Sequence, residues 1–186
     1  MTEKEKMLAG LMYSPSDPTL MAERQKVRLL FHKFNHLSEE HLEERTKVLY
    51  EIFGEAGENL FVEPPFFCDY GSNIKAGKNV FMNFNCCILD VAEVTIGDNC
   101  MFAPNVQIYT ATHPIESKAR NSRKEFAKPI KIGNNVWIGG NSTICPGVTL
   151  GNNVVVGAGS VVTKSFPDDV VIAGNPAKII KSIDNS

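Results

Sequence analysis

The sequence predicts an all-β fold: a parallel β-helix of six-residue repeats, preceded by a short α-helical segment and interrupted by one projecting loop. The main observation is that aliphatic residues recur at every sixth position through six successive units between residues 132 and 167. Val or Ser fills the fifth position of most of these units, and Gly, Asn and Asp gather in between. An amphipathic α-helix repeats every 3.6 residues and cannot produce this period.

Each six-residue unit has the pattern of a short strand followed by a tight turn. The first positions of the six units are Ile132, Ile138, Ile144, Leu150, Val156 and Val162, and the fifth positions are Val136, Ser142, Val148, Val154, Ser160 and Phe166. Gly, Asn and Asp between the aliphatic residues tolerate the positive φ angles of sharp corners. Three units make one triangular coil, and neighbouring coils stack about 4.8 Å apart with their first-position residues inside.

A second block of repeats precedes the first and extends the β-helix. Its regular units begin at Ile96, Phe102 and Ile108, and looser units begin at Ala76, Met82 and Ile88. Two extra residues before Ile96 imply a bulge near Asp90. We therefore expect a β-helix over residues 59–177.

Within the β-helix, residues 114–130 carry no aliphatic first positions and are predicted to form a loop outside the coils. A long excursion from a regular scaffold usually serves a functional site. Its charges, Glu125 among them, serve either to close the loop over a ligand or only to keep it soluble. Glu125 could orient His113 or bind a hydroxyl group.

The two ends of the chain differ from the repeats. Residues 1–58 form a helical N-terminal segment, with apolar residues at helical spacing in one stretch that Asp17 opens and in a second that follows the candidate N-cap Ser38. These helices are expected to cover the open end of the coils. Residues 178–186 are predicted to form a tail with a short basic helix through Lys181.

Composition excludes several classes of protein. Nineteen basic and twenty-one acidic residues give a net charge of −2, so no bulk positive field exists for binding nucleic acid. No apolar run approaches the roughly 18 residues of a membrane span, and the first residues lack the apolar core of a signal peptide. We expect a cytoplasmic protein that binds neither nucleic acid nor membrane.

The cysteines and histidines argue against a metal site. The five cysteines form no Cys-x-x-Cys pair, which indicates reduced thiols rather than disulfides or zinc ligands. Only one of the four histidines, His113, lies in the coil region, whereas a zinc site of γ-carbonic anhydrase type needs three imidazoles. We expect no metal.

His113 stands where the regular coil ends and the loop begins, directly before Pro114. The proline restricts His113 to extended backbone conformations and so holds the direction of the imidazole. One interpretation is a general base that works near neutral pH, and the other is a corner histidine bonded to a neighbouring carbonyl group.

Several motifs together resemble the maltose and galactoside O-acetyltransferases, a family of hexapeptide-repeat acyltransferases. They are Cys68-Asp69-Tyr70-Gly71, Asn83-Phe84-Asn85, Tyr109 to Pro114, Ile132 to Gly140, Val161 to Lys164 and Gly174-Asn175-Pro176-Ala177. The resemblance runs nearly end to end and includes residues 3–10. It implies a left-handed β-helix and a homotrimer that binds acetyl-CoA between its subunits.

The resemblance also implies roles for individual residues. His113 is similar to the catalytic base of the family, and Asn83 to the residue that stabilises the oxyanion and contacts the acceptor. Asp17 and Asp69 fall near the family's contacts to the acceptor sugar, although Asp17 is equally suited to cap a helix and Asp69 to form a turn. Val91 stands where the family has a second carboxylate, which leaves the sugar preference open.

For the donor, the resemblance points to residues of the C-terminal coils and the tail. They are Trp137, Gly140, Ala158, Thr163, Lys164, Lys178 and Lys181. Small residues let a pantetheine arm lie along strand edges, and lysines can bind the nucleotide phosphates. The alternatives are a solvated lysine face and, for Trp137, an aromatic residue of the trimer interface.

The expected function is transfer of acetyl from acetyl-CoA to the primary 6-hydroxyl of maltose, glucose or a related sugar, directly within a ternary complex. An acyl-cysteine on Cys86 or Cys87 is disfavoured because no second histidine is placed to activate it. A galactoside acceptor is the alternative within the family. A non-catalytic trimer that acts as a binding scaffold is the alternative from another class.

Overall fold

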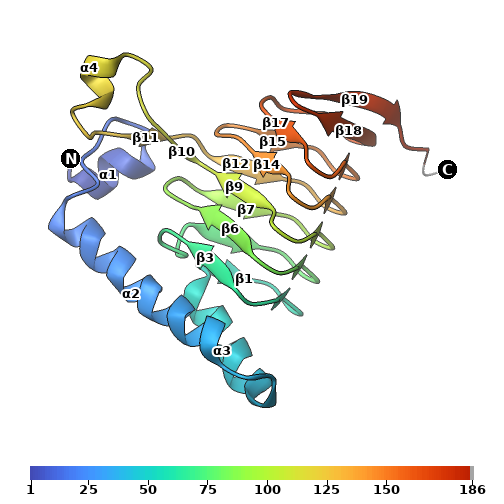
Figure 1. Ribbon diagram of the computed structural model, residues 1–186, viewed down its shortest axis with the longest axis horizontal. Helices are drawn as coiled ribbons and strands as arrows, with labels where there is room; N and C mark the ends of the chain where they lie inside the picture. Colours follow the sequence, from blue (N-terminus) through green and yellow to red (C-terminus); the bar gives the residue numbers. More distant parts are fainter. Residues whose placement is uncertain (185–186) are drawn as a thin grey trace.

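The chain winds into a triangular column of stacked coils with helices at one end, in a computed structural model that describes residues 1–184 (Figure 1). The first face of the column consists of β1 (Glu55–Ala56), β4 (Ile74–Ala76), β7 (Val94–Ile96), β12 (Ile130–Ile132) and β15 (Thr149–Leu150). The second face consists of β2 (Phe61–Val62), β5 (Phe81–Met82), β8 (Met101–Phe102), β13 (Trp137–Ile138), β16 (Val155–Val156), β18 (Val170–Gly174) and β19 (Ala177–Ser182). The third face consists of β3 (Phe66–Cys68), β6 (Cys86–Leu89), β9 (Gln107–Tyr109), β14 (Thr143–Ile144) and β17 (Val161–Val162).

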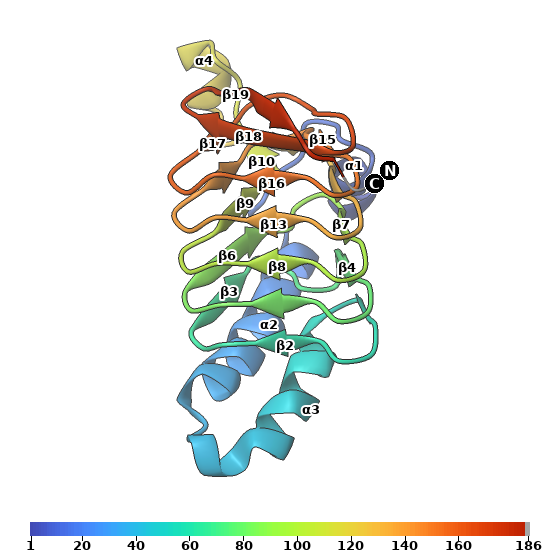
Figure 2. The same cartoon turned by 90° about the vertical axis from the view of Figure 1, so that its right-hand side faces the viewer.

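All of these strands pair in parallel except β19, and the chain ascends as a left-handed coil (Figure 2). Equivalent positions lie 18 residues apart in the upper coils, as Asn135 and Asn153 do, which is three six-residue units. They lie 20 residues apart in the lower coils, as Asn79 and Asn99 do. The predicted parallel β-helix is confirmed, and the looser spacing of the early repeats corresponds to two additional residues per coil.

The repeat positions pack as expected. The six first-position residues from Ile132 to Val162 are at most 1% exposed, and Val136, Ser142, Val148, Val154 and Ser160 are equally buried. The aliphatic residues among them belong to one continuous apolar cluster that extends from the helices to the last coil. Burial of each Val, Leu or Ile side chain contributes about 1.5–3 kcal/mol, so every repeat adds to the stability of the column.

The corners of the coils depend on residues with a left-handed backbone. Asn79, Asn99 and Asn135 have φ between 55° and 57° and form part of a ladder in which each side-chain amide donates to the side chain one coil above, at 3.0 and 3.2 Å. Beside this ladder runs a column of glycines. A Cβ atom on Gly133 would lie 2.7 Å from the carbonyl atoms of Gly151, so the column admits no side chain.

Helices close the lower end of the column. They are α2 (Pro18–His36), a 3-10 turn η1 (Glu39–His41) and α3 (Leu42–Ile52), whereas α1 (Glu3–Leu8) packs beside α2 and β11 (Phe126–Ala127), away from this end (Figure 1). Asp17 caps α2 with its side chain; Ser38 takes the N-cap position of η1, which runs directly into α3, but its side chain makes no capping hydrogen bond. Within residues 1–184, no helix is long and apolar enough to cross a membrane.

The helices α2 and α3 pack onto the first coil. The Asn35 amide both donates to the carbonyl of Phe66 and accepts from its N–H, at 2.9 and 2.8 Å, which satisfies groups that no strand below could bond. Phe34 and Ile52 continue the core of the coils. The expected capping role of the N-terminal segment is confirmed.

The excursion is structured. It contains α4 (Ser117–Arg120) and an antiparallel pair of β10 (Ala111–Thr112) with β11 (Phe126–Ala127), which projects from the column (Figure 1). The excursion therefore lies where residues 114–130 were predicted to leave the coils, except that Ile130 already belongs to β12. Because Asn99 and Asn135 are 36 positions apart, the excursion adds 18 residues to one coil and leaves the register intact.

The C-terminal segment differs from its prediction. The short helix expected through Lys181 was wrong, because residues 177–182 form β19, which pairs antiparallel with β18. The free edge of β18 offers unpaired backbone groups, and the neighbouring residues Ile179 and Ile180 favour a strand. The last two residues of the predicted tail 178–186 lie outside the described residues.

The glycine column yields a stability prediction. Gly133→Ala brings a Cβ atom against backbone and is expected to lower the free energy of unfolding by about 2–3 kcal/mol. Gly159→Asn is the matched control, because Gly159 has φ +71° and open space and occupies the corner that Asn141 takes one coil below. Urea unfolding measures both variants, and equal midpoints for the two would contradict the packing argument.

Candidate active site

The third face, the loop and the N-terminal segment meet around a hollow of about 320 Å³. Its polar lining residues are Arg24, Arg28, Asp69, Tyr70, His113 and Glu125. Three residues singled out from the sequence, His113, Asp69 and Glu125, therefore lie together. Their charges make the hollow a candidate site for a ligand rich in hydroxyl groups, because carboxylates accept and guanidinium groups donate hydrogen bonds.

His113 and Glu125 face one another across the base of the loop. The β10–β11 pairing joins Thr112 to Phe126, so the same register sets the next residue on each side, His113 and Glu125, opposite each other. The His113 Nε2 atom lies 3.6 Å from the Glu125 Oε2 atom. The His113 side chain is half exposed, which leaves its imidazole accessible to a ligand, whereas Glu125 is 16% exposed.

Asp69 belongs to a turn that a buried carboxylate holds in place. The backbone N–H groups of Asp69 and Tyr70 donate to Asp90 Oδ1 at 3.0 and 2.9 Å, and that of Asn73 donates to Oδ2 at 3.2 Å. Burial raises the pKa of Asp90 to about 7, against the opposing effect of the backbone donors. The bulge expected near Asp90 is the turn that supplies this anchor.

Two arginines of α2 complete the hollow. Arg24 donates to the Tyr70 hydroxyl at 2.6 Å and also to the carbonyl of Pro15. Burial raises the pKa of Asp69, and the negative charge of Glu125 raises it further, while Arg24 and Arg28 lower it. The guanidinium groups thus allow two carboxylates to share one small volume.

The remaining acceptor candidate, Asp17, lies elsewhere in the fold. Its Oδ1 atom accepts from the backbone N–H groups of Thr19 and Leu20, at 3.0 and 3.3 Å. It is not among the residues that line the hollow. Its visible function is therefore to cap α2.

Asn83 follows β5 at the edge between the second and third faces, which we name the Asn83 edge. Its side-chain oxygen accepts from the Phe84 N–H at 2.7 Å. Gly140 and Ala158 follow β13 and β16 on the same edge, two and three coils higher. Three of the predicted site residues, Asn83, Gly140 and Ala158, therefore lie in a straight line along this edge.

Thr163 and Lys164 lie on the opposite edge of the third face, which we name the His113 edge. They follow β17, two coils above β9, from which the chain runs to His113. The third face, one six-residue unit of strand and turn in width, separates the two edges, which is roughly 15–20 Å. One chain therefore does not bring Asn83 and His113 together.

The other donor candidates lie on the second face. Trp137 is half exposed, next to the Asn83 edge and in register with Met101 one coil below. Lys178 and Lys181 stand on β19, opposite Ala173 and Val171. The lysines thus lie at the upper end of the column.

The cysteines fit poorly with covalent catalysis. Burial raises the pKa of the Cys86 and Cys87 thiols to about 11, so only about one in ten thousand is ionised at pH 7. Among residues 1–184, no group of three or more His, Cys, Asp or Glu side chains gathers in a way that could hold a metal ion.

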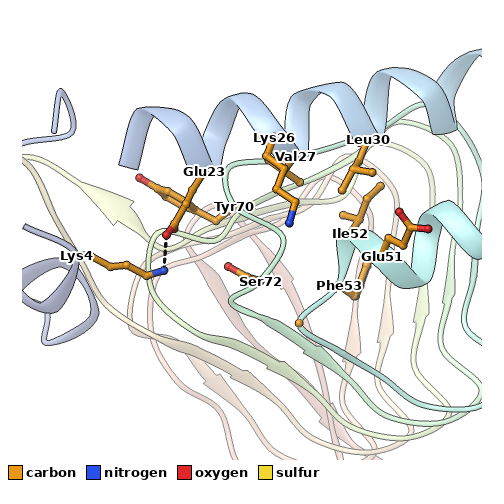
Figure 3. Close-up of a pocket in the computed structure, with 11 residues that line it drawn as sticks. Lys4, Glu23, Lys26, Val27, Leu30, Glu51, Ile52, Phe53, Tyr70 and Ser72 are labelled. Carbon is orange, nitrogen blue, oxygen red and sulfur yellow. Dashed lines mark hydrogen bonds and ion pairs between the residues drawn. The ribbon is translucent and has the colours of Figure 1, made fainter. Parts of the chain in front are cut away.

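A separate hollow of about 280 Å³ lies between α2, α3 and the first coil (Figure 3). Lys4 and Glu23 form an ion pair of 2.6 Å at one end of it, and Lys26 and Glu51 line it farther along (Figure 3). Tyr70 lines this hollow and also the one that contains His113. The lining residues of this separate hollow include no imidazole and no thiol, and none of the sequence-predicted catalytic residues is among them.

Comparisons with known proteins match this architecture. The model of the maltose acetyltransferase hexapeptide capping motif matches residues 6–57, and that of the bacterial transferase hexapeptide (six repeats) matches residues 129–164. The galactoside O-acetyltransferase of Escherichia coli (strain K12) is 43% identical over 181 residues, which cover 97% of this chain and 89% of the relative. The chain belongs to the maltose and galactoside O-acetyltransferase family.

Solved structures of the family agree over the whole chain. A maltose O-acetyltransferase from Clostridium difficile 630 is 51% identical, with a TM-score of 0.98, and the match covers 100% of this chain and 99% of that one. A galactoside acetyltransferase in complex with coenzyme A is 43% identical, with a TM-score of 0.97, covering 100% and 92%. The family member described here is an acyltransferase, which argues against the scaffold alternative.

Four residues in or beside the hollow were not predicted as site residues from the sequence: Tyr13, Arg24, Arg28 and Tyr70. Arg24 and Arg28 are four positions apart on α2, and this spacing was the signal that both lie on one helical face. Tyr13 lies in an irregular stretch, where no periodicity indicates burial. Its contacts with Glu125 were therefore not predictable from spacing.

The anchor of the Asp69 turn yields a prediction. Asp90→Asn replaces one acceptor oxygen with an NH₂ group, so that at least one of the three backbone donors loses its partner. The expected loss is about 1–3 kcal/mol in the free energy of unfolding, because the site is buried. Asp98→Asn is the control, since Asp98 accepts from the Lys78 N–H in an exposed turn. Equal stability of the two variants would contradict the role of Asp90.

Proposed function

We propose that this acetyltransferase transfers the acetyl group of acetyl-CoA to a hydroxyl group of maltose, glucose or a related sugar, with the primary 6-hydroxyl as the reacting group. The observation that carries the proposal is the gathering of His113, Asp69 and Glu125 around one hollow. A relative solved with coenzyme A and a relative described as a maltose O-acetyltransferase support the donor and the acceptor class.

In the proposed mechanism, the His113 imidazole removes the proton from the sugar hydroxyl while its oxygen attacks the thioester carbonyl. The resulting tetrahedral intermediate carries a negative oxygen, to which the Asn83 amide and a backbone N–H donate. Such a donor contributes roughly 3–4 kcal/mol in other acyl-transfer sites. The C–S bond then breaks, and the imidazolium returns its proton to the departing thiolate, which leaves coenzyme A as a thiol.

The acceptor is held by the charged groups around the hollow. Asp69 and Glu125 accept hydrogen bonds from sugar hydroxyls, and Arg28 donates to sugar oxygens. A further open hollow of about 480 Å³ adjoins Arg24 and Arg28, which gives room for a sugar longer than a monosaccharide. Asp17, at the start of the same helix, remains a candidate contact for the far end of such an acceptor.

The donor is proposed to lie between two subunits of a homotrimer. Its pantetheine arm runs along Gly140 and Ala158, flanked by Trp137, and its phosphates meet basic side chains. Those side chains are Lys164, Lys178 and Lys181, with Thr163 beside them. A neighbouring subunit would then bring its Asn83 edge against the His113 edge, which joins the two halves that one chain keeps apart.

The outer surface of the second face supports this assembly. Phe61, Phe81, Met101 and Trp137 form a column on successive coils, and three of them are 37–50% exposed. Burial of such a column against another subunit is favourable. The column adjoins the Asn83 edge, so the same contact would complete the site.

Release of coenzyme A thiol tests the function. The enzyme is mixed with acetyl-CoA and one acceptor from a panel of maltose, glucose, a β-galactoside and a nucleotide sugar. Highest kcat/KM with maltose or glucose supports the proposal, and highest kcat/KM with the β-galactoside supports the alternative within the family. No release above buffer with any of the four would contradict a sugar acceptor, and mapping of the acetylated product checks the 6-hydroxyl.

Removal of the general base gives the second test. His113→Ala is expected to lower kcat at least 100-fold while the affinity for coenzyme A stays within about twofold, because only the proton transfer is lost. The matched control is His41→Ala, since His41 lies in the exposed turn η1. Turnover close to that of the control would overturn the mechanism.

Mixed trimers test the shared site. Chains with His113→Ala and chains with Asn83→Ala are each expected to be nearly inactive, but co-expression should restore about a quarter of the active sites, since intact His113 and Asn83 then meet across interfaces. The activity of equal mixtures, with the trimer verified by sedimentation, provides the measurement. A fully active monomer, or no recovery on mixing, would refute the shared site.

A further inference from the structure

Tyr13 is a buried tyrosine that contacts Glu125, one of the residues that line the hollow around His113. Tyr13 itself does not line that hollow. It lies between α1 and α2 and is 0% exposed. Its backbone N–H donates to the Glu125 carbonyl at 3.0 Å, and the Glu125 N–H donates to the Tyr13 carbonyl at 3.2 Å. Through this antiparallel bridge, the N-terminal segment pairs with the residue that precedes β11. Figure 1 shows the N-terminal segment beside β11.

The side chains of this pair also interact. The Tyr13 hydroxyl donates to Glu125 Oε1. Burial raises the pKa of Tyr13 far above its ordinary value, and the bond to Glu125 raises it further, so the hydroxyl keeps its proton at every working pH. The Tyr13 hydroxyl therefore occupies the Oε1 atom of the Glu125 carboxylate.

The other oxygen of Glu125 stays available to the hollow. Oε2 lies 3.6 Å from His113 Nε2, beyond hydrogen-bonding distance, so the two atoms flank a common space. A hydroxyl group placed there reaches both. Around the phenol ring, the packing is apolar: Met7, Leu20, Val91 and Ala127 share its cluster, which leaves the Tyr13 ring fixed by close packing.

We propose that Tyr13 is a positioning residue for acceptor recognition: it holds Glu125 so that Oε2 accepts a hydrogen bond from a second hydroxyl group of the acceptor, beside the hydroxyl that reacts at His113. This inference rests on the proposed function. It names the substrate class more narrowly, as a polyol with a second donor hydroxyl close in space to the hydroxyl that is acetylated. It also makes the N-terminal segment part of the acceptor site.

Tyr13→Phe isolates the hydrogen bond, because phenylalanine keeps the ring and removes only the hydroxyl. The expected result is about a tenfold rise in the KM for the best sugar of the panel, with kcat and the KM for acetyl-CoA within about twofold of the wild type. The matched control is Tyr50→Phe, since Tyr50 donates to the Gly57 carbonyl far from the hollow. Its kinetic constants are expected to equal those of the wild type.

A double-mutant cycle with Glu125→Gln separates positioning from a general effect on folding. If Tyr13 acts through Glu125, Tyr13→Phe adds less than about twofold to the KM of the Glu125→Gln variant. Full additivity, an unchanged KM in Tyr13→Phe, or a fall in kcat alone would each overturn the proposal; the last result would instead assign Glu125 to orienting His113. Glu125→Gln also tests the contact by itself, should Tyr13→Phe fail to fold.

The wild-type enzyme in the same assay separates the two proposals. If it acetylates a sugar and Tyr13→Phe matches it, only the positioning role fails. If the wild type acetylates no sugar, the proposed function fails and the inference about its acceptor fails with it. A deoxy analogue of the preferred sugar completes the test, since the wild type should discriminate against one deoxy position more strongly than Tyr13→Phe does.

Discussion

The close approach of backbone to backbone at the corners of the coils is the constraint on which the rest of the structure depends. The glycine column leaves no room for a Cβ atom between coils, and asparagines with positive φ turn the chain beside it. Stacking at strand spacing is possible only where both conditions hold on each coil. The asparagine ladder then satisfies side chains that would otherwise compete with the backbone for hydrogen bonds.

Straight edges follow from this constraint, and the chemistry of the molecule is arranged along them. Successive coils superpose, so residues that lie 18 or 20 positions apart fall in one line. Asn83, Gly140 and Ala158 share one edge for that reason, while Thr163 and Lys164 share the edge of His113. The flat third face between the edges has a fixed width, which no side chain of the same subunit can span. An enzyme built on this scaffold therefore has a structural reason to work as an assembly.

The sequence predicted those features that are encoded by period and by turn chemistry. Ile132 and its equivalents marked the core, and the loss of period after His113 marked the loop, so the position of His113, the candidate general base, at a coil end was foreseeable. Asp69 was a candidate only through the family resemblance and Glu125 only as a charge of the loop, so their convergence on one hollow came from the structure. The spacing of Arg24 and Arg28 indicates that they share a face of α2, but not which part of the coils that face meets. The contacts of Tyr13 were not foreseeable, because no periodicity tells where an irregular segment packs. The strand β19 was missed because its partner is the free edge of β18, a property of the finished stack rather than of residues 177–182 themselves.

The excursion between β10 and β12 leaves one coil and rejoins the stack with the ladder from Asn99 to Asn135 unbroken. The coil from Asn99 to Asn135 is 18 residues longer than a regular upper coil, yet the strands above and below the excursion pair as if it were absent. Insertions, deletions or replacements in this segment are thus decoupled from the stability of the column. The residues around the hollow can therefore change in the excursion and in the N-terminal stretch that touches it without altering the stacked edges of the column.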